Sequence, residues 1–426
     1  MGRYTGIIGI VFILLIAFVM SNNRKAINKR LVITGLLLQL GLAIFILKVP
    51  LGQQMFAGLG YFITRLLDFA LKGGEFVFGT FLNRPVMEKV FGPGSSFIFV
   101  LMLLPTIIFV CVLVSIAYHI GMMQRIVAII AKVVHWIMQV SGSEALSNVA
   151  SAFIGQVEAQ ILIRPYIKGM TMSELLASMT GSMACIAGGV MAVYISMGVP
   201  ASYLLAASLM AIPGALVISK IVYPETEESE TKGTVKLDVK KTHINLMDAI
   251  SHGASDGMKV SLNVIAMLIG VIALVALIDA SLGYLGRGLA HTNLNLSAIG
   301  IDINHLTLSG ILGSVFSILA WTMGVPLNDI HAVGSLMGTK LVLNEFVAYS
   351  QLSPMIASTA LSAKAIAIAS FALCGFANFS SVAMQVGGIG ALVPERRGDL
   401  AKLGIKAMIC GSLASFLSAT LAGILM

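Results

Sequence analysis

The chain has 426 residues, of which 58% are hydrophobic and 11% are charged. Soluble domains carry about 25% charged residues, so this composition excludes an ordinary globular protein and indicates a polytopic membrane protein. The apolar runs are continuous, whereas a transmembrane β-barrel alternates apolar and polar residues, so we expect an all-α fold. The cysteines lie far apart in apolar segments and predict neither a disulfide framework nor a metal cluster: Cys111, Cys185, Cys374 and Cys410.

The net charge of +8 is a topology signal and does not indicate nucleic-acid binding. Four of the nine residues in 22–30 are basic, and short basic loops stay in the cytoplasm. Residues 5–21 carry no convincing signal-peptide features, so we expect a retained first span. The sequence therefore predicts a multi-pass protein of the plasma (inner) membrane, with the N-terminus and the C-terminus outside.

The first third of the chain alternates between strong and weak apolar stretches, and we expect residues 1–140 to form mainly a scaffold. A membrane-spanning helix needs about 20 apolar residues, which predicts spans at 5–21, 31–47 and 96–118. Charged residues interrupt two weaker stretches, 53–71 and 126–140, which are typical of interfacial helices. A short external helix is expected between them, at 83–90.

Residues 141–169 form an apolar passage that carries Gln156 and Glu158 at its middle. A carboxylate at that depth persists mainly where it faces a cavity, a partner or a transported solute. The two flanking runs are too short to span a bilayer. They therefore favour a re-entrant hairpin that turns at Gly155, and the alternative is a surface amphipathic helix with a solvated glutamate.

The next segments complete the first half of a predicted transport domain, residues 141–223. Residues 174–197 are interrupted by a run rich in glycine and serine, which fits either a broken helix or close helix packing, and 201–223 is a regular span. Residues 224–259 are predicted as a cytoplasmic loop. A span at 260–278, an outer loop to Asn304 and an interfacial stretch at 306–323 make residues 260–323 scaffold again.

The same order then returns in residues 324–426, the second half of the predicted transport domain. An interrupted segment at 324–349 carries Asn344 and Glu345, 371–381 is a second broken helix, and 403–426 is the closing span. An odd number of crossings separates the two hairpins, so they should enter from opposite faces. Inverted repeats with helices broken at the midplane are typical of secondary transporters.

The polar residues of these tips and breaks are amides, hydroxyls and two carboxylates, without Arg or Lys. This set suits a neutral polyhydroxylated solute, because a carboxylate accepts two hydroxyl donors and an amide pairs with the edge of a heterocycle. An anionic solute would favour Arg. The set comprises Gln156, Glu158, Asn344, Glu345, Asn378, Ser380 and Ser381.

Three motifs resemble the concentrative nucleoside transporter family: GQVEA at 155–159, NEFVAY at 344–349 and FALCGFANFSS at 371–381. The resemblance extends over nearly the whole chain. It implies a homotrimer whose protomers each have eight transmembrane helices and two re-entrant hairpins, with a scaffold that holds a mobile transport domain. It also implies import of nucleosides by an elevator-type mechanism.

The resemblance also implies roles for individual residues. Gln156 and Glu158 would contact the nucleobase and the polar end of the site. Glu345, Asn378 and Ser381 would hold the ribose hydroxyls, and Phe376 and Val190 would pack against the nucleoside. Val157 stands where the family commonly has a hydroxyl near the base. The family's sodium site falls on the side chains of Ser151 and Cys185 and on the backbone carbonyls of Ile154 and Ile186.

Two of these positions depart from the family's sodium site, where Asn and Ser stand. A thiol is a poor ligand for a cation that prefers oxygen, and Ser151 reaches less far than Asn would. Members of the family that use protons also lack the Asn. We therefore favour H+ over Na+ as the coupling ion, with Glu158 or Glu345 as the proton carrier, and we expect no cofactor.

Other interpretations remain open on the sequence alone. They are sodium-coupled nucleoside symport and transport of another neutral polar solute. A channel fits less well, because its polar residues would form a continuous stripe or ring. An intramembrane hydrolase could use Glu158 and Glu345 as an acid–base pair, but neither an H-E-x-x-H motif nor a Ser–His pairing accompanies them. We therefore expect a transporter and not an enzyme.

Overall fold

The computed structural model describes residues 2–91, 98–231, 244–289 and 306–426, and their regular structure is helical throughout, which confirms the all-α prediction. The α-helices are α1 (Gly2–Val19), α2 (Lys29–Leu47), α3 (Pro50–Phe78), α4 (Arg84–Phe91), α5 (Phe99–His119), α6 (Met122–Met138), α7 (Gly142–Ser151), α8 (Glu158–Leu162), α9 (Arg164–Ile167), α10 (Met172–Ala184), α11 (Gly188–Ser196), α12 (Ala201–Val222), α13 (Leu246–Leu289), α14 (Leu308–Thr322), α15 (Ile330–Val342), α16 (Glu345–Ala357), α17 (Ala363–Leu373), α18 (Phe379–Leu392) and α19 (Arg397–Leu425).

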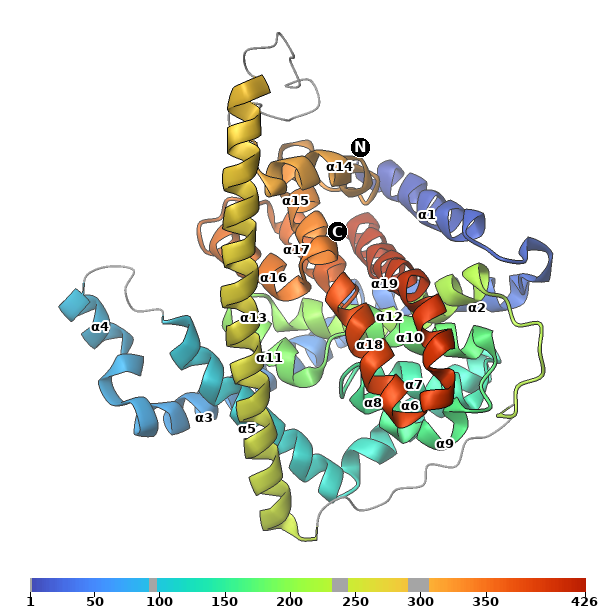
Figure 1. The fold of residues 1–426 in the computed structure, drawn as a ribbon, viewed down its shortest axis with the longest axis horizontal. Coiled ribbons are helices and arrows are strands. Elements are labelled where there is room, and N and C mark those ends of the chain that lie inside the picture. The colour runs from blue at the N-terminus through green and yellow to red at the C-terminus, as the bar shows by residue number, and fades with distance from the viewer. Residues whose placement is uncertain (1, 92–97, 232–243, 290–305) are drawn as a thin grey trace.

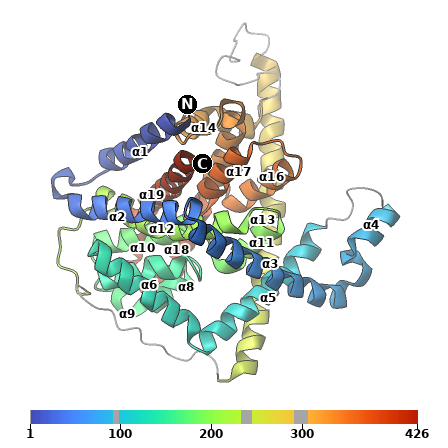
Figure 2. The same cartoon turned by 180° about the vertical axis from the view of Figure 1, so that it is seen from behind.

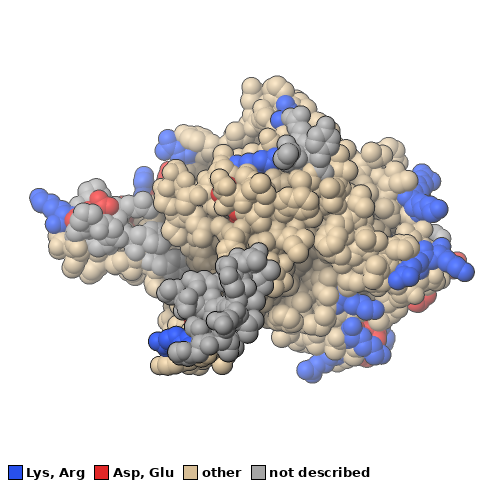
Figure 3. Space-filling view, turned by 90° about the horizontal axis from the view of Figure 1, so that it is seen from above, with Lys and Arg blue, Asp and Glu red and all other residues tan. Residues whose placement is uncertain are grey.

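Six helical segments in the described residues are long and apolar enough to cross a membrane: α2, α5, α10 with α11, α12, α13 and α19. The two remaining predicted spans correspond to α1 and to α17 with α18, which are apolar but shorter. In Figure 3 most of the visible described surface is uncharged, and most of its Lys and Arg side chains lie towards the periphery.

The sequence-based bounds of α13 are wrong at both ends. A span was expected at 260–278, but the helix runs from Leu246 to Leu289, so it begins inside the predicted cytoplasmic loop 224–259 and continues into the predicted outer loop. Residues 290–305 of that outer loop lie outside the described residues. A Cβ at Gly257 would lie 2.6 Å from the Cα of Ile108. This glycine therefore lets α13 pack closely against α5 (Figure 1) and does not break the helix.

Two more bounds differ from the prediction. The second hairpin was expected to end at Tyr349, but α16 continues to Ala357. The last helix, expected from residue 403, already begins at Arg397. In both cases the added residues include polar ones that interrupt the apolar run, so hydropathy alone makes the helix too short.

Each predicted half has the same order of elements. In the first half the hairpin α7–α9 is followed by the broken helix α10–α11 and by α12; in the second half α15–α16 is followed by α17–α18 and by α19. The helices are interrupted at residues 185–187 and 374–378, which confirms the interpretation of 174–197 as a broken helix. The spans α12 and α19 pack against each other and against the broken helices (Figure 1).

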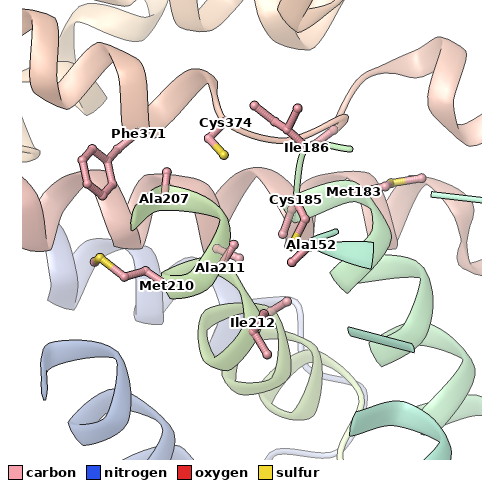
Figure 4. Close-up of a cluster of buried hydrophobic side chains, with 14 of the residues drawn as sticks. Ala152, Met183, Cys185, Ile186, Ala207, Met210, Ala211, Ile212, Phe371 and Cys374 are labelled. Carbon is pink, nitrogen blue, oxygen red and sulfur yellow. The ribbon is translucent and has the colours of Figure 1, made fainter. Parts of the chain in front are cut away.

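The two breaks lie back to back in the core. Gly375 has a φ of +119°, and a Cβ there would lie 2.7 Å from the carbonyl oxygens of Met183 and Ala184 at the end of α10. On the other side, the thiol of Cys185 donates to the carbonyl of Ser208 at 3.7 Å, and the Ser208 hydroxyl lies 3.6 Å from the sulfur of Cys374. Figure 4 shows Cys185 and Cys374 converging beside α12.

A buried ionic cluster ties the first half together. The ammonium of Lys220 on α12 lies 2.8 Å from a carboxylate oxygen of Glu144 on α7 and 3.3 Å from one of Glu225, and it donates to the hydroxyl of Ser173 on α10 at 2.9 Å. Glu144 also closes the capping box of α7 with Ser141. One cation therefore fixes hairpin, broken helix and span to each other.

The N-terminal and C-terminal helices run side by side. A Cβ at Gly6 would meet the side chain of Ile424, and α1 packs along α19. Figures 1 and 2 both show the two chain ends close together beside α14. The termini therefore lie at the same end of the molecule.

Replacing Gly375 by alanine tests the contact between the breaks. The substitution adds a Cβ at a positive φ and against two backbone carbonyls, so we expect a large loss of thermal stability of the purified protein in detergent, by a few kcal/mol or more. The control is Gly387→Ala on α18, where a Cβ meets nothing within 4 Å and helix propensity predicts a gain of about 0.5–1 kcal/mol. Equal melting temperatures for the two variants would contradict this account.

Candidate functional site

The tip of the second hairpin places a carboxylate at the start of a helix. Asn344 is the N-cap of α16, and its side-chain oxygen accepts from the backbone N–H of Val347 at 2.9 Å. Glu345 is therefore the first residue of the helix, where the free N–H groups and the helix dipole stabilise negative charge. Its side chain is buried.

Glu345 accepts one hydrogen bond at each oxygen. The hydroxyl of Tyr194 on α11 donates to one oxygen at 3.2 Å, and the side-chain amide of Asn378 donates to the other at 2.9 Å. The Tyr194 ring stacks on Tyr349 with centroids 4.2 Å apart. Sequence analysis missed Tyr194, although its hydroxyl inside the apolar run 190–196 is a signal that a partner lies nearby.

The second break, residues 374–378, supplies the side-chain amide that contacts the Glu345 carboxylate. Asn378 is the N-cap of α18, and its side-chain oxygen accepts from the N–H of Ser381 at 2.9 Å and from the hydroxyl of Ser380 at 2.7 Å. The Ser381 hydroxyl is buried and has no hydrogen-bond partner in the part of the chain that is described. Phe376 lies half-buried in the same break.

The tip of the first hairpin rests on α18. The chain turns at Gly155, whose φ is +153°, and the side-chain amide of Gln156 points to the sulfur of Met384 at 3.6 Å. The Gln156 side-chain oxygen is buried and unpaired among the described residues. Val157 packs on Gly388, where a Cβ would lie 2.8 Å away. Glu158 begins α8 and is exposed.

Both hairpin tips therefore meet one helix. The second touches Asn378 and the first touches Met384, and these residues are about 9 Å apart along α18 at 1.5 Å per residue. Val190 is half-buried and lies one turn before Tyr194 on the same face of α11. The structure thus gathers Gln156, Val157, Glu345, Asn378 and Ser381 around the first three turns of α18.

The residues of the candidate sodium site lie where the first hairpin meets the first break. The N–H of Gly188 donates to the carbonyl of Phe153 at 3.2 Å, which joins the two segments. The Ser151 hydroxyl donates to the carbonyl of Ser147 at 2.7 Å and lies 3.0 Å from the Ser182 hydroxyl. Cys185 and Ile186 are fully buried, and Ile154 is half-buried.

The donor set fits sodium poorly. The Ser151 oxygen keeps lone pairs while its hydroxyl donates to Ser147, but its side chain reaches less far than the Asn of the family's site, and the Cys185 thiol is a soft ligand that a hard cation does not favour. Backbone carbonyls of Ile154 and Ile186 are chemically suitable oxygen ligands. Two of the four implied ligands therefore suit the ion and two do not.

Sequence analysis also missed a polar ladder beneath this site. Gln160 accepts from the hydroxyl of Ser178 at 2.6 Å and donates to the hydroxyls of Ser182 and Ser147 at 2.6 and 3.0 Å. All of these groups are buried, and the ladder ends at Ser151 through Ser182. The sequence does carry a signal for this ladder, because Gln160 is a second glutamine in the apolar stretch, four residues after Gln156.

Three family models match successive parts of the chain. They are described as the N-terminus of Na+ dependent nucleoside transporters over residues 8–81, nucleoside recognition over 100–201, and the C-terminus of Na+ dependent nucleoside transporters over 203–423.

Two bacterial relatives match over almost their full length. The chain is 40% identical over 428 residues to an uncharacterized transporter of Haemophilus influenzae, covering 100% of this chain and 98% of the relative. It is 37% identical over 421 residues to the nucleoside permease NupC of Helicobacter pylori, covering 98% and 96%.

Solved structures agree with this match. The structure of CNTnw in an inward-facing substrate-bound state has a TM-score of 0.90 at 39% identity, over 99% of this chain and 98% of that one. A doubly substituted CNTnw in an outward-facing state has a TM-score of 0.91 at 39% identity, over 100% and 98%. These proteins are transporters, which agrees with the prediction that the chain is not an enzyme. The chain belongs to the sodium-dependent nucleoside transporter family, the concentrative nucleoside transporters.

Proposed function

We propose that the protein imports nucleosides across the plasma (inner) membrane by cation symport. The observation that carries this proposal is the arrangement at α18, where a buried carboxylate, an amide and an unpaired hydroxyl surround one helix start. A carboxylate has about four acceptor positions, and Tyr194 and Asn378 occupy two of those on Glu345. The backbone N–H of Glu345 also interacts with this carboxylate, and the acceptor capacity that is left suits ribose hydroxyls.

The other site residues divide between base and sugar. In this proposal Glu345, Asn378 and Ser381 hold the ribose, and the unpaired Ser381 hydroxyl gains a partner when the sugar binds. Gln156 contacts the base through its unpaired oxygen, with Glu158 at the polar end. Val157, Val190 and Phe376 supply the apolar walls. A different neutral polar solute would satisfy the same atoms less completely, because it lacks either the diol or the heterocycle edge.

The motion we propose is of the elevator type. The two halves, residues 141–223 and 324–426, move as a transport domain against a scaffold built from 1–140 and 260–323, in a homotrimer. The buried pairing of Lys220 with Glu144 supports a rigid first half. The adjacent chain ends support termini on one side of the membrane, and the basic residues of 22–30 favour the outside for both.

For the coupling ion we propose the proton rather than sodium. The thiol at position 185 and the short side chain of Ser151 support this choice, since sodium would have to tolerate a soft ligand and a hydroxyl that reaches less far than Asn. The sodium-dependent relatives, such as the mouse sodium/nucleoside cotransporter 1 at 38% identity, make sodium coupling the alternative.

Replacing Glu345 by glutamine tests ribose recognition. The amide has one acceptor oxygen where the carboxylate has two, and each lost charge-assisted hydrogen bond costs about 1.5–3 kcal/mol, or about tenfold or more in affinity. We expect uridine uptake into proteoliposomes to be nearly abolished. The matched control is Glu395→Gln, whose carboxylate lies on the surface 3.8 Å from Lys168. Unchanged apparent affinity for uridine and adenosine in Glu345→Gln would refute the assignment.

Separate ion gradients test the coupling. We expect an inward proton gradient to drive uptake and an inward sodium gradient at equal pH to have little effect. The pair Ser151→Asn with Cys185→Ser restores two oxygen ligands and should partly restore sodium dependence. A control pair, Ser151→Asn with Cys410→Ser, alters a buried cysteine of α19 instead. Saturable sodium stimulation of the unmodified protein at fixed pH, with no response to a protonophore in sodium-free buffer, would overturn proton coupling.

A further inference from the structure

The second half of the chain contains a fully buried lysine that the site described above does not use. Lys340 lies in the last turn of α15 and is 0% exposed. Its ammonium donates to the carbonyl of Ala372 at 2.8 Å and lies 3.4 Å from the carbonyl of Cys374. It also lies 5.5 Å from the centre of the Phe416 ring. A charged amine inside a membrane protein is costly and is typically found where it has a specific task.

The two carbonyls belong to the end of α17 and to the start of the second break. The last carbonyls of a helix have no partner within the helix and carry partial negative charge. Neighbouring groups of the same kind have neutral donors, because Tyr349 donates to the carbonyl of Ser370 at 2.8 Å and Ser415 donates to that of Cys374 at 2.6 Å. Lys340 supplies the one positive charge among these described donors.

The corresponding place in the first half lacks such a charge. There the hairpin helix α7 ends at Ser151, whose hydroxyl binds Ser147 and Ser182, and the first break begins at Cys185. Within the described residues, the polar groups at that junction are hydroxyls, the Gln160 amide, a thiol and carbonyls. The first junction is the candidate site for the coupling ion, whereas the second is filled by an ammonium of the protein itself.

We propose that Lys340 is a positioning residue, a built-in cation that holds the second break in place of a bound ion. By fixing the carbonyls of Ala372 and Cys374, it sets the path of the chain from Cys374 to Asn378. Asn378 is the residue that donates to Glu345 at 2.9 Å. The second half is thereby shaped permanently for ribose, while only the first half depends on a dissociable cation. The ribose part of this inference rests on the proposed function.

The reactivity of the Cys374 thiol reports on the break directly. We start from a background that retains Cys374 alone among the cysteines and measure its labelling by N-ethylmaleimide without nucleoside. Cys374 is buried, so labelling of the parent should be slow. Lys340→Met, which keeps the length of the side chain but removes the charge, should raise the rate by about tenfold or more, because thiol labelling follows exposure. Lys340→Arg keeps the charge and should stay closer to the parent than Lys340→Met does.

Two controls separate a local effect from general unfolding. Lys402→Met removes an exposed lysine of α19 and should leave the Cys374 rate unchanged. In a second background that retains only Cys410, which is fully buried in α19, Lys340→Met should leave labelling unchanged. Equal increases at Cys374 and Cys410 would mean global loosening and would overturn the positioning role, as would a Cys374 rate that Lys340→Met does not alter.

Nucleoside binding then tests the link to ribose. Lys340→Met should lower the affinity for uridine by about tenfold and change that for 2′,3′-dideoxyuridine much less, so that discrimination between the two collapses. Retained discrimination in a variant with raised Cys374 labelling would overturn the link to ribose. Failure of the unmodified protein to bind either uridine or adenosine would refute the proposed function instead, and the Cys374 rates would still decide whether Lys340 holds the break.

Discussion

A helix that stops inside a membrane must satisfy its free backbone groups without water. This constraint governs the centre of the protein, where two helices stop close to each other. The end of α10 lies so close to Gly375 that a Cβ there would be 2.7 Å from its carbonyl oxygens. The end of α17 meets Lys340, and α18 begins at the amide cap of Asn378. The polar groups that stabilise the breaks are thus inseparable from those that face the solute, because the same amide caps α18 and binds Glu345.

Each hairpin brings a polar tip into the protein interior, between apolar spans. Their tips meet α18 at different turns, so the start of this one helix sets the distance between the two ends of the site. Mobility of the whole domain would leave that distance unchanged. For the related CNTnw, solved structures are described as inward-facing and as outward-facing.

Much of this arrangement could be predicted from the sequence, and the failures have physical causes. Hydropathy and isolated carboxylates located both hairpins, both breaks and Glu345, because burial of such groups is costly enough to need an explanation. Hydropathy failed at α13, where Gly253 and Gly257 look like loop residues but serve close packing. Hydropathy also predicts no role for Tyr194, Gln160 or Lys340, because their hydrogen-bond partners lie in other helices and are known only from the folded structure. The assigned contacts of the site residues with a nucleoside remain predictions.

The pairing of Glu144 with Lys220 bears on how the protein is made. Glu144 enters the ribosome's exit tunnel well before Lys220, which lies near the end of α12. A first hairpin inserted alone would bury a carboxylate without its cation, at a cost of several kcal/mol. The nascent hairpin should therefore wait at the membrane surface until α12 has been synthesised, and insertion of the two should be coupled. We therefore expect the first half to insert into the membrane as one unit, because the Glu144 carboxylate and the Lys220 ammonium must be buried together.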